Sequence, residues 1–159
     1  MAAYIKFDGI DGEATDKDHK DWTDLAAFSQ LITKPGQGTG ATRRRGDVIL
    51  EDLHCTKELD KSSPKIAEAV CKGKVFPKVE IHLTASYTDS GRVTYYAYEL
   101  KNVQVVSYDI SGSGQSDDVP MENFSLNFEE IKVTYTANDN TGKSKGNIEY
   151  TWKVEEGEA

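Results

Sequence analysis

The chain has 159 residues and a mass of 17.6 kDa, which is enough for one domain with a substantial core but not comfortably for two. Hydrophobic residues make up 37% and charged residues 29%, a composition that argues against the disordered and membrane-spanning classes. Acidic residues outnumber basic ones by 27 to 19, and the net charge of -8 argues against a nucleic-acid partner, whose phosphates would be repelled.

The N-terminal segment reaches an acid at Asp8 before any apolar run develops, so it predicts no secretory signal peptide. No stretch approaches the roughly 20 apolar residues that cross a bilayer. We therefore expect a chain made in the cytoplasm, without stable membrane insertion. Cys55 and Cys71 are too few and too far apart for a zinc site or a redox pair. A disulfide between these two cysteines stays an alternative.

The first irregular region covers residues 34–47 and contains four glycines. A segment of this length without regular structure is uncommon inside a compact domain and is usually functional. We therefore predict a long extended loop here. Beyond it, the apolar phase shifts between Leu50 and Leu53, which we interpret as a β-bulge near Glu51 and Asp52.

One helix is predicted over about residues 64–72. Ser63 can cap its start, Pro64 suits the first helical position, and Gly73 can end it in a left-handed conformation. A helix this short is not stable alone and must pack on a sheet. Its narrow apolar stripe consists of Ile66, Ala67, Ala69 and Val70.

Alternation with a period of two dominates the second half of the chain and is typical of a sheet with one buried face. Residues 79–85 and 148–154 each place alternate side chains on an apolar face, with His82 on the outward side. Residues 92–110 are long enough for two strands or for one bent strand.

A second phase change follows near the C-terminal end. The apolar positions are even-numbered in residues 124–128 and odd-numbered in residues 131–135, so we predict a β-bulge at Glu129 and Glu130. Strongly bent strands favour a closed barrel or a curled sandwich. The pattern predicts a single, mainly β domain over residues 1–159, with one helix and one long loop.

Most chemical motifs fail on their context. Residues 36–41 fit the loose pattern GxGxxG/A, but a strand-like segment follows where a helix is required. The three histidines are scattered. His19 lies in an acidic run that is typical of a solvated loop or of the entry to a strand, His82 lies on the outside of a strand, and His54 lies beside Cys55. No nucleophile, base and orienting group come together. The sequence therefore predicts no enzyme, no metal site and no cofactor.

The exception to the acidic composition is a run of three arginines, Arg43, Arg44 and Arg45, inside the predicted loop. Three adjacent cations repel one another unless they are solvated or matched by acids. The simplest match is the acidic surface of a second copy of the chain. A solvated loop without a partner is the alternative.

Several longer segments resemble the haemolysin-coregulated protein (Hcp) family. They are YIKFDGIDGE at residues 4–13, DKDHK at 16–20, DKSSPKIAEA at 60–69 with GK and FP shortly after it, VPMENFSLNFEEIKVTY at 119–135, and YTW at 150–152. The resemblance follows nearly the whole chain in order, which makes it far more specific than any short motif.

This resemblance implies the tube subunit of a bacterial type VI secretion system. It implies a β-barrel of two curled antiparallel sheets with a flanking helix and a long extended loop. Six copies of such a subunit form a ring, and rings stack into a hollow tube that carries a spike and is exported when its sheath contracts. The implied partners are therefore a homo-hexamer, the sheath, the spike protein and effectors carried in the lumen.

Two kinds of site residue follow from the resemblance. The family places a small polar residue in the lumen, just after an aromatic residue, in the strand before the long loop. Residues 27–29, with the sequence AFS, fit this position and make Ser29 the lumen candidate. The arginine triplet, Arg43, Arg44 and Arg45, is the candidate for ring stacking. The alternative function is a cytoplasmic effector-binding chaperone, or a secreted interaction protein, without a tube role.

Overall fold

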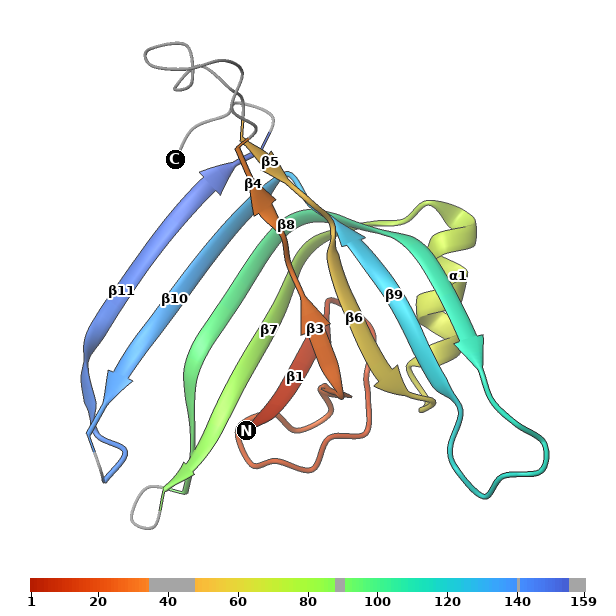
Figure 1. Cartoon of the computed structure of the whole chain (residues 1–159), viewed down its shortest axis with the longest axis horizontal. Helices are drawn as coiled ribbons and strands as arrows, with labels where there is room; N and C mark the ends of the chain where they lie inside the picture. Colours follow the sequence, from red (N-terminus) through yellow and green to blue (C-terminus); the bar gives the residue numbers. More distant parts are fainter. Residues whose placement is uncertain (35–47, 88–90, 140, 155–159) are drawn as a thin grey trace.

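The computed structural model describes residues 1–34, 48–87, 91–139 and 141–154. Most of these residues lie in antiparallel strands, and one helix packs beside them (Figure 1). The elements in chain order are β1 (Ala2–Phe7), β2 (Thr23–Leu25), β3 (Ala27–Ser29), β4 (Ile32–Thr33), β5 (Ile49–Leu50), β6 (Leu53–Glu58), α1 (Ser63–Lys72), β7 (Val75–Tyr87), β8 (Gly91–Ser111), β9 (Met121–Asn127), β10 (Glu130–Asn138) and β11 (Ser144–Lys153).

Nine of the described strands form one strongly curled sheet (Figure 1). Its order is β2-β1-β7-β8-β9-β6-β3, while β10 pairs with β8 and carries β11, so that these two strands form an arm of the sheet. A second, two-stranded sheet consists of β4 and β5. The predicted mainly β fold, with two antiparallel sheets and one short helix, is confirmed.

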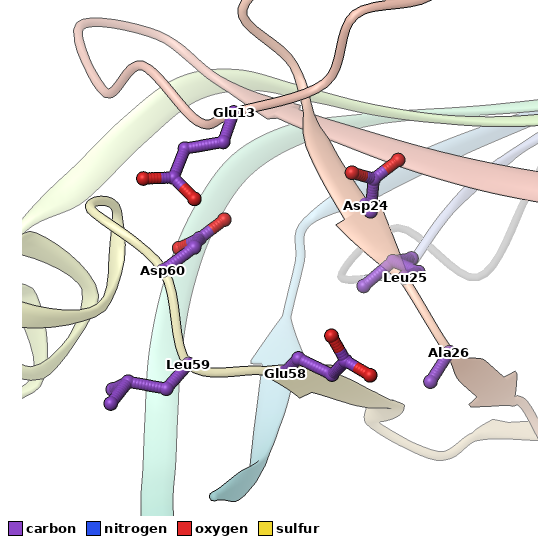
Figure 2. A pocket seen from close by; sticks show the side chains of 7 residues that line it. All are labelled: Glu13, Asp24, Leu25, Ala26, Glu58, Leu59 and Asp60. Atoms are coloured by element: carbon purple, nitrogen blue, oxygen red, sulfur yellow. The ribbon is translucent and has the colours of Figure 1, made fainter. Parts of the chain in front are cut away.

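The predicted closed barrel, in contrast, does not form as a continuous ladder of strands. The strands at the two ends of the order, β2 and β3, follow each other in the sequence and do not pair with each other in the described part of the chain. Ala26 lies between them, beside the end of β6 (Figure 2), and its N–H donates to the carbonyl of Thr56 at 2.8 Å. The sheet therefore curls until its ends meet at Ala26, where the chain changes partners.

Strand β8 joins the two halves of the sheet. It pairs with β7 along its first part, with β10 on its other side in the middle, and with β9 along its last part. Its register with β9 shifts between Val105 and Ser107, where the strand bends. Of the two possibilities for residues 92–110, the structure has one long bent strand.

Both predicted β-bulges are wrong, because the chain passes from one strand to another at these places. β9 ends at Asn127 before β10 begins at Glu130, and β5 ends at Leu50 before β6 begins at Leu53. β9 pairs with β6 and β8, whereas β10 pairs with β8 and β11. β8 stays the partner on one side of this break, while the neighbour on the other side changes from β6 to β11. Such a break resets which side chains face the core, so it produces the same phase change as a bulge.

Helix α1 forms where the sequence predicts it. Pro64 lies in the first turn, and Gly73 ends the helix in the left-handed region with φ 62°. The N-cap is Ser62 rather than the predicted Ser63, and its side chain makes no capping hydrogen bond. The helix packs its buried side against β8. No helix in the described residues is long and apolar enough to span a membrane.

The core fills the inside of the curl. Alternate side chains from most strands point into it, together with the buried side of α1. Each fully buried large apolar side chain contributes about 1.5–3 kcal/mol relative to an exposed one. The largest of them are Ile5, Phe7, Leu53, Ile66, Phe76, Ile81, Leu100, Phe124, Leu126 and Ile131.

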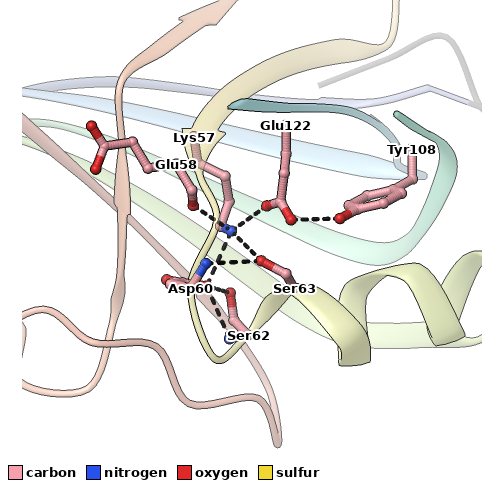
Figure 3. A network of polar contacts seen from close by, with 7 residues as sticks. All are labelled: Lys57, Glu58, Asp60, Ser62, Ser63, Tyr108 and Glu122. Carbon is pink, nitrogen blue, oxygen red and sulfur yellow. Dashed lines mark hydrogen bonds and ion pairs between the residues drawn. The ribbon is translucent and has the colours of Figure 1, made fainter. Parts of the chain in front are cut away.

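A buried ion pair between Lys57 of β6 and Glu122 of β9 is the centre of a polar network that joins α1 to the sheet (Figure 3). The ammonium of Lys57 also donates to the hydroxyl of Ser63 at 3.0 Å and lies 3.0 Å from a carboxylate oxygen of Asp60. Glu122 accepts a further hydrogen bond from the hydroxyl of Tyr108 at 2.5 Å. Burial and this bond to Glu122 raise the pKa of Tyr108. Because buried charges destabilise a fold unless they are paired and hydrogen-bonded, the network fixes the start of α1 onto β6, β8 and β9.

Both cysteines are free, so the alternative of a disulfide is not realised. Cys55 is buried in β6, and Cys71 is exposed on α1. Burial raises the pKa of the Cys55 thiol, which keeps it protonated and unreactive.

Replacing Lys57 with methionine tests the buried ion pair. The substitution leaves the carboxylate of Glu122 buried without this cation, so we expect the free energy of unfolding to fall by about 3–5 kcal/mol in urea denaturation. The double variant Lys57→Met/Glu122→Leu removes both charges and should recover most of that loss. Lys72→Met, which breaks an exposed ion pair with Glu68, is the control and should change stability little. A Lys57→Met variant as stable as the parent would contradict this role.

Candidate functional site

Ser29, the predicted lumen residue, lies at the end of β3 and is exposed. Its register partner is His54 on β6, which pairs with Ser125 on β9, which in turn pairs with Ser107 on β8. Directly paired residues share one face of a sheet. These four side chains therefore form a row across the sheet, on the face opposite to the core residue Cys55.

Hydrogen bonds connect the side chains of this row and of the next row along the strands. The hydroxyl of Ser107 donates to Oγ of Ser125 at 2.8 Å, and this Oγ lies 2.8 Å from Nδ1 of His54. In the next row, the hydroxyl of Thr56 donates to Oδ1 of Asn123 at 2.7 Å. We call this surface the polar face; it consists of Ser29, His54, Thr56, Ser107, Asn123 and Ser125.

The polar face is suited to contact rather than to catalysis. Ser125 touches His54, but among the described residues no carboxylate is hydrogen-bonded to His54 to orient it as a base. The hydroxyl of Ser125 is also held by Ser107. A wall of small, mutually bonded polar groups offers hydrogen bonds to a neighbouring surface without apolar adhesion. Of this face the sequence predicted only Ser29, because aligning the outward positions of β6 and β9 requires the strand register.

The arm formed by β10 and β11 carries an apolar strip that continues the core face beyond the core. Along β10 the exposed fraction rises outward, from 0% at Ile131 to 3% at Val133 and 46% at Tyr135. On β11, Tyr150 is 44% and Ile148 is 75% exposed, although the alternation predicted a buried face here. Tyr135 and Ile148 are register partners. The apolar strip is defined as Tyr135, Ile148 and Tyr150.

β11 is also an edge of the sheet, because it pairs only with β10 in the part of the chain that the structure describes. The outward-facing backbone groups of a strand of 10 residues are a template for pairing with another chain. Beside this edge, the indole N–H of Trp152 is buried without a hydrogen-bond partner among the described residues. A long edge next to exposed apolar side chains marks an interaction surface.

An acidic pocket lies where β6 ends (Figure 2). The carboxylates of Glu13, Asp24, Glu58 and Asp60 line a cavity of about 350 Å³. Burial and then the charges of Asp60 and Glu58 raise the pKa of Asp24 above its usual range. Among the described residues, neither lysine nor arginine lines this cavity. Asp60 is already paired with Lys57, so the attraction of the acidic pocket for positively charged partners comes from Glu13, Asp24 and Glu58.

The arginine triplet, Arg43, Arg44 and Arg45, lies outside the described residues, so its position is not part of the site geometry. The nearest described strands are β4 and β5, in which Thr33 pairs with Ile49. Figure 1 shows these two strands at one end of the molecule and the end of β6 at the other. β4 and β5 therefore lie at the end of the molecule opposite to the acidic pocket.

Two histidines that are far apart in the sequence lie together in the structure. His19 is buried, with 3% of its surface exposed, and its Nε2 lies 2.9 Å from Nδ1 of His82. The prediction of a solvated His19 is wrong, because its ring is buried. His82 lies on the outward face of β7, as predicted, but the ring of His19 covers part of it. No local pattern signals a pairing across 63 positions. His54 stays apart from them, on the polar face.

Within the described ranges, no group of three or more His, Cys, Asp or Glu side chains is placed to hold a metal ion.

A known protein family and individual known proteins are similar to this chain over most of its length. Residues 4–135 match the family described as "Type VI secretion system effector, Hcp". The chain is 32% identical over 153 residues to Protein hcp1 of Pseudomonas aeruginosa, which covers 95% of this chain and 93% of that protein.

Solved structures share the fold over nearly the whole chain. A type six secretion system protein superimposes with a TM-score of 0.90 at 29% identity, covering 99% of this chain and 98% of its own. Hcp1 from Salmonella typhimurium superimposes with a TM-score of 0.78 at 22% identity, covering 99% and 97%. The chain therefore belongs to the Hcp family of type VI secretion system proteins.

Proposed function

We propose that this chain is the subunit of the inner tube of a type VI secretion system. Six copies form a ring, rings stack into a hollow tube, and contraction of the sheath exports the tube together with its spike and effectors. The protein is then cytoplasmic before firing and extracellular, or inside a target cell, afterwards. Membership of the Hcp family supports this role. The structural observation that carries it is the apolar strip beside the edge of β11.

The apolar strip and the edge both call for a second protein surface. Covering apolar area contributes about 25 cal/mol per Å² removed from water. A patch that binds the same patch of a second copy across a two-fold axis gives a dimer. A head-to-tail contact, in which two different patches bind, closes into a ring when a whole number of copies completes a full turn. In a closed ring every subunit has a neighbour on this side, so a ring covers both the apolar strip and the edge of β11.

Placing a charge in the apolar strip tests the ring. Ile148→Arg puts a cation where a partner's apolar surface is expected, while the backbone of β11 stays as it is. We expect native mass spectrometry to show hexamers for the parent and monomers for Ile148→Arg. The matched control is Asn147→Arg, whose side chain lies on the opposite face of the same strand and is exposed; it should remain hexameric. Circular dichroism confirms that all three proteins are folded.

Two results would contradict this assignment. Hexamers of Ile148→Arg as stable as those of the parent would remove the apolar strip from the interface, and a parent chain that stays monomeric at high concentration would contradict the ring itself. A hexamer that binds effectors but never stacks would instead favour the chaperone or the secreted interaction protein.

Charge complementarity between rings supports stacking. The arginine triplet belongs to the segment between β4 and β5, while the acidic pocket lies at the other end of the subunit. We propose that, in a head-to-tail stack, the triplet of one ring binds the acidic pockets of the next. Such a contact is screened over about 8–10 Å at physiological salt. It is thus weak between free rings and becomes favourable when many copies align on a growing tube.

Charge exchange tests this contact. Replacing Arg43, Arg44 and Arg45 with glutamate should leave hexamers intact but shorten the tubes seen by electron microscopy at low salt. Glu13→Lys/Glu58→Lys in the acidic pocket should do the same, and combining both sets should restore stacking because the two charges are exchanged.

Asp117→Lys/Asp118→Lys, in the exposed segment between β8 and β9, changes the charge by the same amount as Glu13→Lys/Glu58→Lys and is the control for that variant. Normal stacking by the variant with the reversed triplet would show that the triplet is not the contact.

The polar face supports a role as the wall of the channel, with Ser29 exposed to the lumen. Ser29→Arg adds a bulky charge there, so we expect effector retention in co-purification to fall by about tenfold, equivalent to about 1.4 kcal/mol. The hexamer should persist. Ser113→Arg, in the exposed segment after β8, is the control. Unchanged retention by Ser29→Arg would remove Ser29 from the lumen wall.

A further inference from the structure

Residues 11–22, which we call the strap, lie on the outer face of β1 and β7 through the contacts of His19 with Tyr4 and His82. Ile10, just before the strap, still belongs to the core. His19 of the strap stacks on Tyr4 of β1, with ring centroids 4.7 Å apart and planes inclined by 11°. Trp22 at the end of the strap contacts both His19 and His82, at centroid distances of 4.7 and 4.6 Å. The strap therefore buries its aromatic side chains against the outside of the sheet, where Tyr4 is only 6% exposed.

The backbone of the strap closes on itself. The N–H of Gly12 donates to the carbonyl of Asp21 at 2.7 Å, and the N–H of Ala14 donates to the carbonyl of Trp22 at 2.9 Å. A Cβ at Gly12 would lie only 2.5 Å from the carbonyl oxygen of Trp22, so only glycine allows this approach. The strap is thus a tightly folded loop. It contacts β7 through His19, and β8 through the ion pair of Asp16 with Arg92 at 3.5 Å.

The attachment to β7 is a chain of polar atoms from Asp16 through both histidines to Glu80. Nδ1 of His19 donates to Oδ2 of Asp16 at 2.6 Å, because an ionised carboxylate only accepts. In the neutral imidazole this leaves Nε2 of His19 as an acceptor, so Nδ1 of His82 donates to it at 2.9 Å. Nε2 of His82 then faces a carboxylate oxygen of Glu80 at 3.5 Å.

The row of polar atoms from Asp16 to Glu80 can take up one additional proton but not two. A first proton on Nε2 of His82 faces Glu80 and leaves the bond between the imidazoles intact. A second proton, on Nε2 of His19, would set two N–H groups against each other across 2.9 Å and bring two positive charges into contact. The doubly protonated pair cannot keep this geometry.

The surroundings favour the neutral form of His82. Burial, and then the charge of His19, lower the pKa of His82, while Glu80 acts in the opposite sense. A histidine whose pKa is lowered by folding stabilises the fold fully above its ordinary pKa of about 6.5 and loses this contribution as the pH falls below it. The charged and polar groups around the pair are Tyr4 and Lys6 on β1, Asp16 on the strap, Lys78 and Glu80 on β7, and Arg92 and Thr94 on β8.

We propose that His19 and His82 form a proton-operated clasp, which holds the strap on β1 and β7 at neutral pH and releases it when both imidazoles are protonated. Release uncovers Tyr4 and Trp22 on the outside of the sheet. It also moves Glu13, which belongs to the strap, away from the acidic pocket. The clasp is a property of the single subunit and does not depend on the proposed ring or tube.

Hydrogen exchange of the strap amides in the full chain tests the clasp. The amides of Gly12, Ala14 and Asp21 are followed between about pH 7.5 and 4.5, the range in which imidazoles titrate, with correction for intrinsic exchange. We expect protection to fall below about pH 6.5, by about tenfold per pH unit for each proton taken up. His82→Gln cannot be protonated, and its amide can turn either a donor or an acceptor toward His19; its protection should stay level.

His54→Gln, on the separate polar face, is the matched control and should behave as the parent does. If His82→Gln does not fold, NMR titration of the parent protein still tests the clasp. His19 and His82 must then titrate as a coupled pair in two steps, with loss of strap protection following the second step. Protection that stays level in the parent, protection that falls equally in His82→Gln, or two independent single-step titrations would each overturn the clasp.

Discussion

Burial of one apolar face of a curled sheet is the interaction on which the rest of the subunit depends. Strand β8 carries this face from β7 and β10 at one end to β9 at the other, and α1 packs against β8. The same apolar face extends beyond the core along β10 and β11, where the exposed fraction of the side chains rises toward Tyr135 and Ile148. Apolar area therefore stays in contact with water at this edge, and in the proposed ring a second copy covers it.

Polar interactions determine the positions of α1 and of the strap, which burial of the apolar face does not determine. Burial is non-directional, so it does not determine where α1 begins or where the strap lies. The ion pair of Lys57 and Glu122 holds the start of α1, and the pair of His19 and His82 holds the strap on the opposite face of the sheet. Both are buried or half-buried contacts between distant segments. The first joins an ammonium and a carboxylate, whereas the second joins two imidazoles, the side chains that change charge near neutral pH.

The sequence predicts elements whose signals are local and fails where distant segments meet. Pro64 and Gly73 delimit α1 nearly to the residue, because the backbone preferences of proline and glycine act locally. The phase change at Glu129 cannot distinguish a bulge from a change of partner strands. Alternation in residues 148–154 shows an apolar face but not what covers it. Likewise, the acidic pocket and the histidine pair assemble from segments that only the strand register brings together.

We propose that another copy of the chain covers the apolar strip and the edge of β11. Hydrogen–deuterium exchange compares the amides of residues 144–153 at a concentration where the chain assembles and after dilution. We predict that the β11 amides that do not bond to β10 are protected only in the concentrated sample, while amides of β7 exchange equally slowly in both. Equal exchange of β11 in the two samples would contradict assembly through this edge.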